Sequence, residues 1–384
     1  MRLKEVKARV IQNSRGEETI EVIVNKNYRA SAPSGASIGK YEVPAFPSQG
    51  VRYAVTFLNK YPNFKGFSLE EFDDLKVFDN LLSVLGGNTV VALQLACLKA
   101  LSENNIYSFL NPKAKKLPIP LGNCVGGGAH TKVLSTDIQE FLLVPEAKTM
   151  LERVKVNAHI HAQLRKQLHI KTFTDEGALI LKNTNEETLV FLTGFLENKK
   201  NTLGYTVRLG LDLAASQLYR NKQYHYRNFS SAVKKKVLSR EEQITLVNKW
   251  IKEYSLAYVE DPFEQEDFSG FTRIYTKKTL VCGDDLIATN IERFREAVRK
   301  RAINSVIIKP NQIGSLVKAK QLIDFAKKKG VATVISHRSG ETMDTSIAHL
   351  AVAWNIQYIK TGIYGKEREV KLRELVSLEK KILF

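Results

Sequence analysis

Apolar and polar residues alternate near the start of the chain. The alternation covers residues 6–11 and 19–24, and Asn13-Ser14-Arg15-Gly16 supplies a turn between the two runs. Because successive side chains of a strand point to opposite faces, this pattern predicts a β-hairpin. Residues 28–32 predict a third strand beside it.

Helical spacing replaces this alternation further along the chain. Apolar residues recur at i, i+3 and i+4 in the segments 51–59, 69–84 and 89–102, which predicts helices there. The stretch 111–120 is punctuated by prolines and predicts a linker. We therefore predict an N-terminal α+β domain over residues 1–116 and a second domain over residues 117–384.

The start of the second domain is irregular. A glycine-rich loop at 126–130 precedes a predicted strand at 137–145 that begins with an acidic residue, and a predicted helix at 152–168 follows. His159 and His161 lie two positions apart on that helix and therefore point to different faces, which argues against a shared metal. We expect both histidines on the surface.

From Val207 onward one pattern repeats along the chain: an apolar β-prone run, polar residues, then an amphipathic helix. Successive strand ends are separated by 48, 25, 24, 28 and 23 residues, and a βα unit takes roughly 25–30 residues. A parallel array of this length closes most readily into a barrel, whose functional side chains lie at the carboxyl ends of the strands. The residues at these ends are all polar: Asp212, Glu260, Asp285, Lys309, His337 and Lys360. Ser239-Arg240-Glu241-Glu242 adds a capping-box pattern that predicts a helix start.

Three of these strand ends are carboxylates that would converge on one point. Asp212, Glu260 and Asp285 offer hard oxygen ligands, which suit octahedral Mg²⁺. Glu260 and Asp285 each have an acidic neighbour, Asp261 and Asp284. We expect one acid of each pair to bind the metal and its neighbour to support it.

Lys309 ends the next strand and would stand beside this metal. A cation near Mg²⁺ and near Lys360 should have a depressed pKa, which makes Lys309 a candidate general base. The alternative is that Lys309 forms an ion pair with the metal-binding carboxylates.

An arginine and a hydroxyl follow the next strand. Arg338 and Ser339 precede a helix that we expect to start near Thr342, and this combination is typical of phosphate binding. Together with the metal and the base, these residues predict proton abstraction next to the carboxylate of a phosphorylated acid. The metal would stabilise the resulting enolate.

Composition limits the class of protein. The chain has 384 residues, of which 43% are hydrophobic and 26% charged, as in a globular protein of two domains. Its first residues lack the apolar core of a signal peptide, and the apolar run 90–101 is too short to span a bilayer. Three widely spaced cysteines indicate neither a disulfide framework nor a zinc site, so we expect a cytoplasmic protein without a membrane span.

The net charge of +18 has more than one explanation. It fits a solvated basic surface, a partner such as RNA or another polyanion, or a field that steers an anionic substrate. The loop at 34–39 is similarly ambiguous, because small flexible residues suit both a surface linker and a mobile loop that closes over a ligand.

Ten ordered motifs carry a resemblance to a known family. They are Pro33-Ser34-Gly35-Ala36-Ser37, Gly127-Gly128-Ala129-His130, Gln139-Glu140-Phe141, Asp175-Glu176-Gly177, Gly210-Leu211-Asp212-Leu213-Ala214-Ala215-Ser216, Glu260-Asp261-Pro262-Phe263, Gly283-Asp284-Asp285-Leu286, Lys309-Pro310-Asn311-Gln312-Ile313-Gly314, Ser336-His337-Arg338-Ser339-Gly340-Glu341-Thr342 and Ile359-Lys360-Thr361-Gly362. Over nearly its whole length the chain resembles the enolases (phosphopyruvate hydratases). The resemblance implies an α/β fold in which an N-terminal α+β domain precedes an enolase-type β/α barrel with irregular first units.

The resemblance also implies a reaction, the dehydration of 2-phosphoglycerate to phosphoenolpyruvate in glycolysis and gluconeogenesis. Lys309 would remove the C2 proton, and Glu176, helped by Glu140, would protonate the departing C3 hydroxyl. Asp212, Glu260 and Asp285 would hold one Mg²⁺, and Ser37 would join a second Mg²⁺ that arrives with substrate. The implied substrate-binding residues are His130, Glu140, His337, Arg338, Ser339 and Lys360. The family also implies a homodimer or higher homo-oligomer.

Two alternatives remain at this stage. Segments such as 43–47 depart from the family pattern, which leaves open a divergent paralogue that acts on another 2-substituted acid. The charge leaves open a non-catalytic protein of the same fold that binds RNA or another polyanion. The intact set of carboxylates and lysines favours the enzyme.

Overall fold

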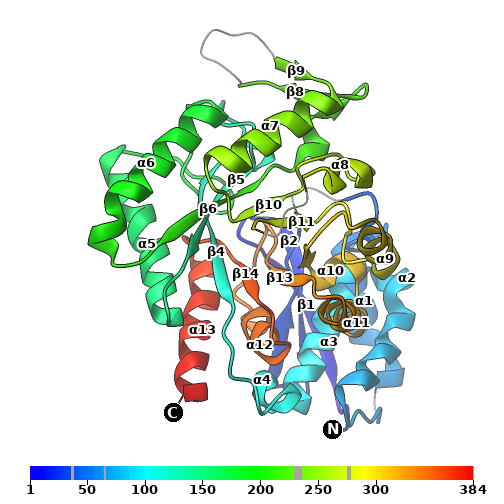
Figure 1. Cartoon of the computed structure of the whole chain (residues 1–384). Coiled ribbons are helices and arrows are strands. Elements are labelled where there is room, and N and C mark those ends of the chain that lie inside the picture. Colours follow the sequence, from blue (N-terminus) through cyan, green and yellow to red (C-terminus); the bar gives the residue numbers. More distant parts are fainter. Residues whose placement is uncertain (36–38, 65, 229–235, 275–277, 384) are drawn as a thin grey trace.

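Eight strands close into a barrel at the centre of the molecule (Figure 1). The computed structural model describes residues 1–35, 39–64, 66–228, 236–274 and 278–383. Around the barrel the strand order is β10-β11-β12-β13-β14-β4-β5-β6. In chain order the barrel strands are β4 (Ile119–Gly126), β5 (Glu140–Pro145), β6 (Val207–Asp212), β10 (Tyr258–Glu260), β11 (Leu280–Gly283), β12 (Ser305–Ile308), β13 (Ala332–Ser336) and β14 (Tyr358–Lys360). The predicted barrel is therefore confirmed.

The first barrel strands are irregular, as predicted. β5 runs antiparallel to both β4 and β6, whereas β6 runs parallel to β10. The beginning of β5 therefore lies at the barrel end where the other strands finish. The sequence interpretation missed β4, because Gly122 and Asn123 interrupt its apolar pattern.

Apolar side chains fill the inside of the barrel in a cluster of their own: Leu121, Leu142, Val144, Ala257, Tyr258, Cys282, Ile307 and Val334. Helices cover the outside (Figure 1). They are α5 (Met150–Gln167), α6 (Asn185–Leu203), α7 (Arg240–Glu253), α8 (Phe268–Thr272), α9 (Ile291–Lys300), α10 (Pro310–Ile313), α11 (Leu316–Lys328), α12 (Ser346–Ala353) and α13 (Lys366–Leu383). The capping box predicted at Ser239 opens α7, and the same device opens α5 at Thr149 and α6 at Thr184.

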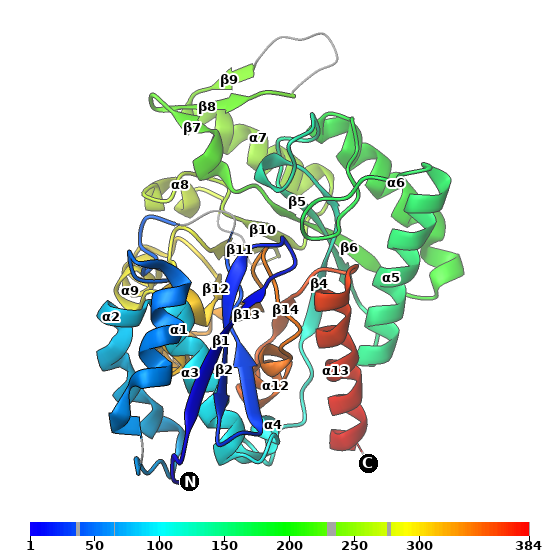
Figure 2. The same ribbon diagram turned by 180° about the vertical axis from the view of Figure 1, so that it is seen from behind.

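A three-stranded antiparallel sheet lies beside the barrel (Figure 2). It consists of β1 (Val6–Gln12), β2 (Glu18–Val24) and β3 (Tyr28–Ser31), which confirms the predicted hairpin and third strand. The helices of this part of the chain are α1 (Gly50–Lys60), α2 (Leu82–Leu85), α3 (Gly87–Leu101) and α4 (Ile106–Leu110). Paired hydrogen bonds between Ser34 and Gly340 tie this region to the barrel. The domain division at residue 116 stays a prediction.

A second small sheet explains the long first interval between strand ends. β7 (Tyr219–Arg220), β8 (Gln223–Tyr226) and β9 (Lys236–Leu238) are inserted between β6 and α7, and the sheet lies at the top of Figure 1. Short 3₁₀ helices connect other elements: η1 (Pro62–Phe64), η3 (Gly128–His130) and η4 (Ala215–Leu218).

The structure corrects three local predictions. Most of the helix predicted at 69–84 is a 3₁₀ helix, η2 (Phe72–Leu81), whose start is tightened by Asp74 accepting the backbone N–H groups of the two preceding glutamates. The helix expected near Thr342 is α12, which begins at Ser346. His161 is buried rather than on the surface, because its ring packs against Tyr364 and lies 3.0 Å from the Gly177 carbonyl.

Among the described residues, no helix combines the length and apolar character that crossing a membrane requires.

Candidate active site

The carboxyl end of the barrel brings the polar strand ends together. Backbone pairing sets Glu140, Asp212 and Glu260 level with one another on three adjacent strands, and Lys360 level with Ser336. A narrow cavity of about 40 Å³ opens there. The predicted residues that line it are His130, Glu140, Glu176, Asp212, Asp285, Lys309, His337, Arg338, Ser339 and Lys360. Glu260 is fully buried next to this lining, and Ser37 lies outside the described residues.

Lys360 lies at the centre of a buried carboxylate cluster. Its ammonium is 2.8 Å from Asp212 Oδ2, 3.0 Å from both Glu260 oxygens and 3.2 Å from Glu140 Oε1. Burial alone would lower the pKa of Lys360, but Asp212, Glu140 and Glu260 raise it well above its ordinary value. The ammonium is therefore charged, and it balances part of the negative charge of the cluster.

A second acidic cluster joins the ends of β10 and β11. Carboxylate oxygens of Asp261, Asp284 and Asp285 lie within 4.8 Å of one another. Asp261 accepts the backbone N–H groups of Asp284 and Asp285, at 3.0 and 2.6 Å, and so fixes the turn that carries them. This contact agrees with the supporting part predicted for Asp261.

The donor set suits Mg²⁺. Burial, together with the charge of Asp212, raises the pKa of Glu260 to about 8, although Lys360 lowers it. Burial and the charge of Asp284 raise the pKa of Asp285 to about 7, with Asp212 adding to the effect. Burial is the largest cause of both shifts and neighbouring carboxylates add to it, so a bound cation would favour the ionised forms. Hard carboxylate oxygens are the ligands that Mg²⁺ prefers. The metal triad of Asp212, Glu260 and Asp285 stays a prediction.

Among the protein's own groups alone, the pKa of Lys309 is raised, and the depressed pKa predicted for it beside Mg²⁺ stays a prediction. Burial is the largest effect and lowers the pKa of Lys309, but Asp284 and Glu260 act together against it, and the net shift is upward. The Lys309 ammonium pairs directly with Asp284, which also accepts a 2.9 Å hydrogen bond from Gln312. The ion pair left open as an alternative is thus present, although its partner is Asp284 rather than a predicted metal ligand.

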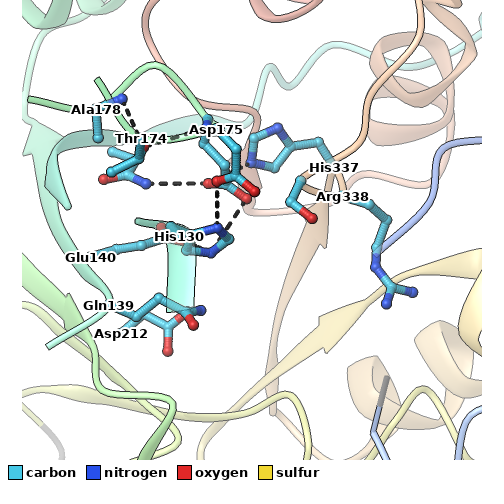
Figure 3. Close-up of polar contacts among 12 residues, drawn as sticks. His130, Gln139, Glu140, Thr174, Asp175, Ala178, Asp212, His337 and Arg338 are labelled. Carbon is cyan, nitrogen blue, oxygen red and sulfur yellow. Dashed lines mark hydrogen bonds and ion pairs between the residues drawn. The ribbon is translucent and has the colours of Figure 1, made fainter. Parts of the chain in front are cut away.

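Two histidines lie next to the candidate acid Glu176. They are His130 and His337, whose rings are shown in Figure 3. His130 Nδ1 donates to Asp175 at 2.7 Å, and its Nε2 lies 3.7 Å from Glu176 and 3.8 Å from Glu140. His337 Nε2 lies 3.4 Å from the other Glu176 oxygen, and Asn123 donates to that oxygen at 3.2 Å. Glu176 is therefore held on several sides.

The pKa values of Glu176, Glu140 and His130 are shifted in different directions. Burial opposes ionisation of Glu176, but His130 and His337 hold the pKa of Glu176 well below its ordinary value. Burial raises the pKa of Glu140 well above its ordinary value, although Lys360 acts against it. Burial also acts against His130, yet Glu176 and Asp175 raise its pKa to about 9. Within this group, His130 and Glu140 therefore hold a proton more readily than usual, and Glu176 less readily.

Arg338 makes an ion pair that the sequence did not predict. Its guanidinium faces both oxygens of Glu42, at 2.8 and 3.1 Å, and both side chains are 6% exposed. Glu42 also accepts the Gly39 N–H at 3.0 Å. The predicted helix N-terminus is absent beside Arg338, because α12 starts eight residues later at Ser346. Ser339 lies near Arg15, whose Nη1 is 3.5 Å from Ser339 Oγ.

Sequence reasoning missed Glu42 and Asn123 as members of the site. Glu42 follows the Gly- and Ser-rich segment 34–39, whose sequence suits more than one role, and Asn123 sits on the unpredicted strand β4. A signal for Glu42 was its position five residues after the family motif Pro33-Ser34-Gly35-Ala36-Ser37.

Comparisons with known proteins cover the whole chain. Residues 114–383 match the family described as enolase, C-terminal TIM barrel domain. A protein of *Methanosphaera stadtmanae* named enolase is 39% identical, with 99% of this chain and 97% of that protein aligned. Enolases of *Methanothermobacter thermautotrophicus* (40% identical, 99% and 97% aligned) and *Natronomonas pharaonis* (37% identical, 98% and 98% aligned) are also similar.

Proposed function

Since this chain belongs to the enolase family, we propose that it catalyses the Mg²⁺-dependent, reversible dehydration of 2-phosphoglycerate to phosphoenolpyruvate. Family membership makes it an enzyme, a carbon–oxygen lyase. The substrate, the metal and the residue roles are our proposal. One observation carries it: Glu140, Asp212 and Glu260 lie level at one barrel end, with Lys360 among them.

Asp212, Glu260 and Asp285 would hold the first Mg²⁺, and Ser37 would join a second one that arrives with substrate. When bound, the metal ions would offset the negative charge that develops on the substrate carboxylate as the C2 proton leaves. The raised pKa values of Glu260 and Asp285 support this assignment, because burial and neighbouring carboxylates disfavour their ionised forms, and a bound cation would favour them.

Lys309 would accept the C2 proton. To do so it must first be neutral, whereas the pairing with Asp284 keeps it protonated. Arg338 and Lys360 both lower the pKa of Lys309, so weakening of the Asp284 contact would bring Lys309 toward its neutral form. The ion pair with Asp284 is therefore the feature that sets how readily Lys309 acts as a base.

Glu176 and Glu140 would handle the proton that the C3 hydroxyl needs in order to leave. The pKa of Glu176 is lowered and that of Glu140 is raised, so Glu140 is the one of the two that more readily holds a proton near His130. That proton would pass to the departing oxygen as the C3–O bond breaks. His130 and His337 would line the site and hold Glu176 in place.

Arg338 and Ser339 would bind the phosphate, and Lys360 would contact the substrate carboxylate. The cavity of about 40 Å³ has room for only a few water molecules. Substrate entry therefore requires internal ion pairs to open, and the pair between Arg338 and Glu42 is the one that a phosphate would replace.

Turnover of 2-phosphoglycerate tests this proposal. Purified protein loaded with Mg²⁺ should form phosphoenolpyruvate, followed by its absorbance, and removal of Mg²⁺ with a chelator should stop the reaction. Folded, metal-loaded protein that forms none contradicts the proposal. Turnover of a related 2-substituted acid alone would then favour the divergent paralogue. Salt-sensitive binding of RNA that survives Lys309→Ala would favour the non-catalytic protein.

We further propose that the protein works in the cytoplasm as a homodimer or higher homo-oligomer. Its three cysteines are free and buried, which suits a reducing compartment. Sedimentation of the purified protein tests the assembly, and a monomer at micromolar concentration contradicts it.

A further inference from the structure

A second cavity adjoins the narrow one at the barrel end. Its volume is about 540 Å³, and its lining comes from the connection between β4 and β5, the end of β6 and the small sheet of β7, β8 and β9. This sheet lies at the top of both Figure 1 and Figure 2. Gln139, Ala214 and Gln217 line both cavities, so the two are direct neighbours. We call the larger one the outer pocket.

Hydrogen bonds join two walls of the outer pocket. Asp137, in the connection between β4 and β5, accepts the backbone N–H groups of Arg227 and Asn228, which follow β8, at 2.7 and 2.9 Å. Asn228 Nδ2 in turn donates to the Ser135 carbonyl at 2.6 Å. The pocket is therefore formed before a ligand arrives, which lowers the entropic cost of binding one.

The outer pocket carries positive charge. Lys132 and Arg220 line it from two different segments, and both residues are exposed. Within the described part of the chain, no carboxylate forms an ion pair with either of them. The carboxylate in the lining, Asp137, is 7% exposed and already accepts two backbone N–H groups. The sequence from 213 to 239 contains six lysines and arginines and no acidic residue. The pocket therefore attracts an anion.

Of the two neighbouring cavities, only the outer pocket has room for an organic acid. The narrow cavity of about 40 Å³ holds a few water molecules, whereas about 540 Å³ is typical of small-molecule sites. Between the two cavities, Gln217 Nε2 donates to Gln139 Oε1 at 3.1 Å. A neutral hydrogen bond contributes about 1 kcal/mol, so this contact can break at small cost as an acid passes.

We propose that the outer pocket is a docking site for the phosphorylated acid on its way to the barrel end. Lys132 and Arg220 hold the phosphate, and the rest of the acid faces Gln217. The identity of the acid rests on the proposed function. Both cations bind the acid before the reaction and take no part in its chemistry.

Calorimetry with 2-phosphoglycerate and a chelator tests docking apart from turnover, because the barrel end then lacks its metal. The folded wild-type protein should show saturable binding with one site per chain. Lys132→Glu/Arg220→Glu should bind roughly tenfold more weakly or worse, a change of about 1.4 kcal/mol. The matched control Lys115→Glu/Lys116→Glu reverses two exposed charges in the segment before β4, at the other end of the barrel, and should keep the wild-type affinity.

Turnover tests whether the docked acid is on the path to the barrel end. With Mg²⁺ at low salt, Lys132→Glu/Arg220→Glu should lower kcat/KM roughly tenfold or more and keep kcat within about twofold, because it weakens the encounter and not the chemistry. Lys132→Arg/Arg220→Lys preserves both charges and should keep the wild-type kcat/KM. Added salt should reduce kcat/KM of the wild type far more than that of the charge-reversed variant.

Two results overturn the proposal. One is the absence of saturable binding in chelator, or binding by Lys132→Glu/Arg220→Glu that is as tight as that of the Lys115→Glu/Lys116→Glu control. The other is a kcat/KM equal in these two variants. A wild-type protein that does not turn over 2-phosphoglycerate contradicts the proposed function instead, and the calorimetric comparison then decides by itself whether the outer pocket holds the acid.

Discussion

Replacing Lys360 with methionine removes the one cation at the centre of the buried carboxylate cluster. The Lys360 side chain is 3% exposed, and its partners Glu140, Asp212 and Glu260 are at most 5% exposed. Removing one partner of a buried ion pair costs about 3–5 kcal/mol. We expect Lys360→Met to lower the free energy of unfolding by about 3–5 kcal/mol in total, and not by that amount for each of the three carboxylates that Lys360 contacts. The loss of stability is limited because burial raises the pKa values of Glu140 and Glu260, so these side chains can take up protons when the ammonium is removed.

Proton uptake by Glu140 and Glu260 determines how the stability loss in Lys360→Met changes with pH. Glu140 and Glu260 have pKa values above those of the unfolded chain, so their protonated forms favour the folded state at low pH. That contribution is lost as pH rises through the folded pKa values. The deficit of Lys360→Met should therefore be smallest near pH 5 and grow toward about pH 8, because the variant must then hold uncompensated charge.

Urea unfolding is a convenient assay, since Trp250 and Trp354 are buried and report loss of packing through their fluorescence. Measured with a chelator and again with Mg²⁺, the variant should recover part of its lost stability in Mg²⁺, because a cation between Asp212 and Glu260 replaces the ammonium. Lys7→Met serves as control, because Lys7 is 57% exposed and its loss should cost within about 0.5 kcal/mol. A loss below about 1 kcal/mol in Lys360→Met, with or without metal, would refute the reasoning.

Three further predictions concern other contacts. The folded-state pKa of His130 is about 9 against an ordinary 6.5, so its stabilisation is complete below about pH 6.5 and is lost as pH rises through about 9. Urea unfolding at both ends of this window should show wild type losing up to about 3 kcal/mol more than His130→Gln, and parallel losses would contradict this. Ser239→Ala removes the cap of α7 and should cost about 1 kcal/mol in the same assay, whereas no change would show that the capping box is dispensable. Glu42→Gln removes the carboxylate that competes with an anion for Arg338, so inorganic phosphate should bind roughly tenfold tighter by calorimetry, and weaker binding would mean that Glu42 positions Arg338 rather than competes for it.

The periodic part of the barrel was predictable because its signals are local. Each strand from β6 to β14 ends in or next to a polar residue at nearly regular intervals, and parallel strands bring such ends to one rim. The capping box of α7 and the N-terminal hairpin were predictable for the same reason. The direction of β5 was not, since alternation along a strand does not say which way its neighbours run. Glu140 reaches the site only because β5 is reversed.

Pairings between charged residues were harder to predict than the residues themselves. Lys309 was expected beside a metal, whereas its ion pair with Asp284, which raises the pKa of Lys309, was not expected. Arg338 and Glu42 are 296 residues apart in the chain, and no spacing rule connects them. Such contacts depend on how the N-terminal segment folds back on the barrel.

Exchange of the C2 proton tests the central claim, that Lys309 abstracts a proton from a metal-bound phosphorylated acid. In deuterated water, wild-type protein with Mg²⁺ should incorporate deuterium at C2 of 2-phosphoglycerate. Lys309→Ala should lose this exchange while Mg²⁺ binding by calorimetry stays close to wild type, because the predicted ligands Asp212, Glu260 and Asp285 are intact. Exchange at the wild-type rate in Lys309→Ala would contradict the role of Lys309, and absence of exchange in the metal-loaded wild type would contradict the proposed chemistry.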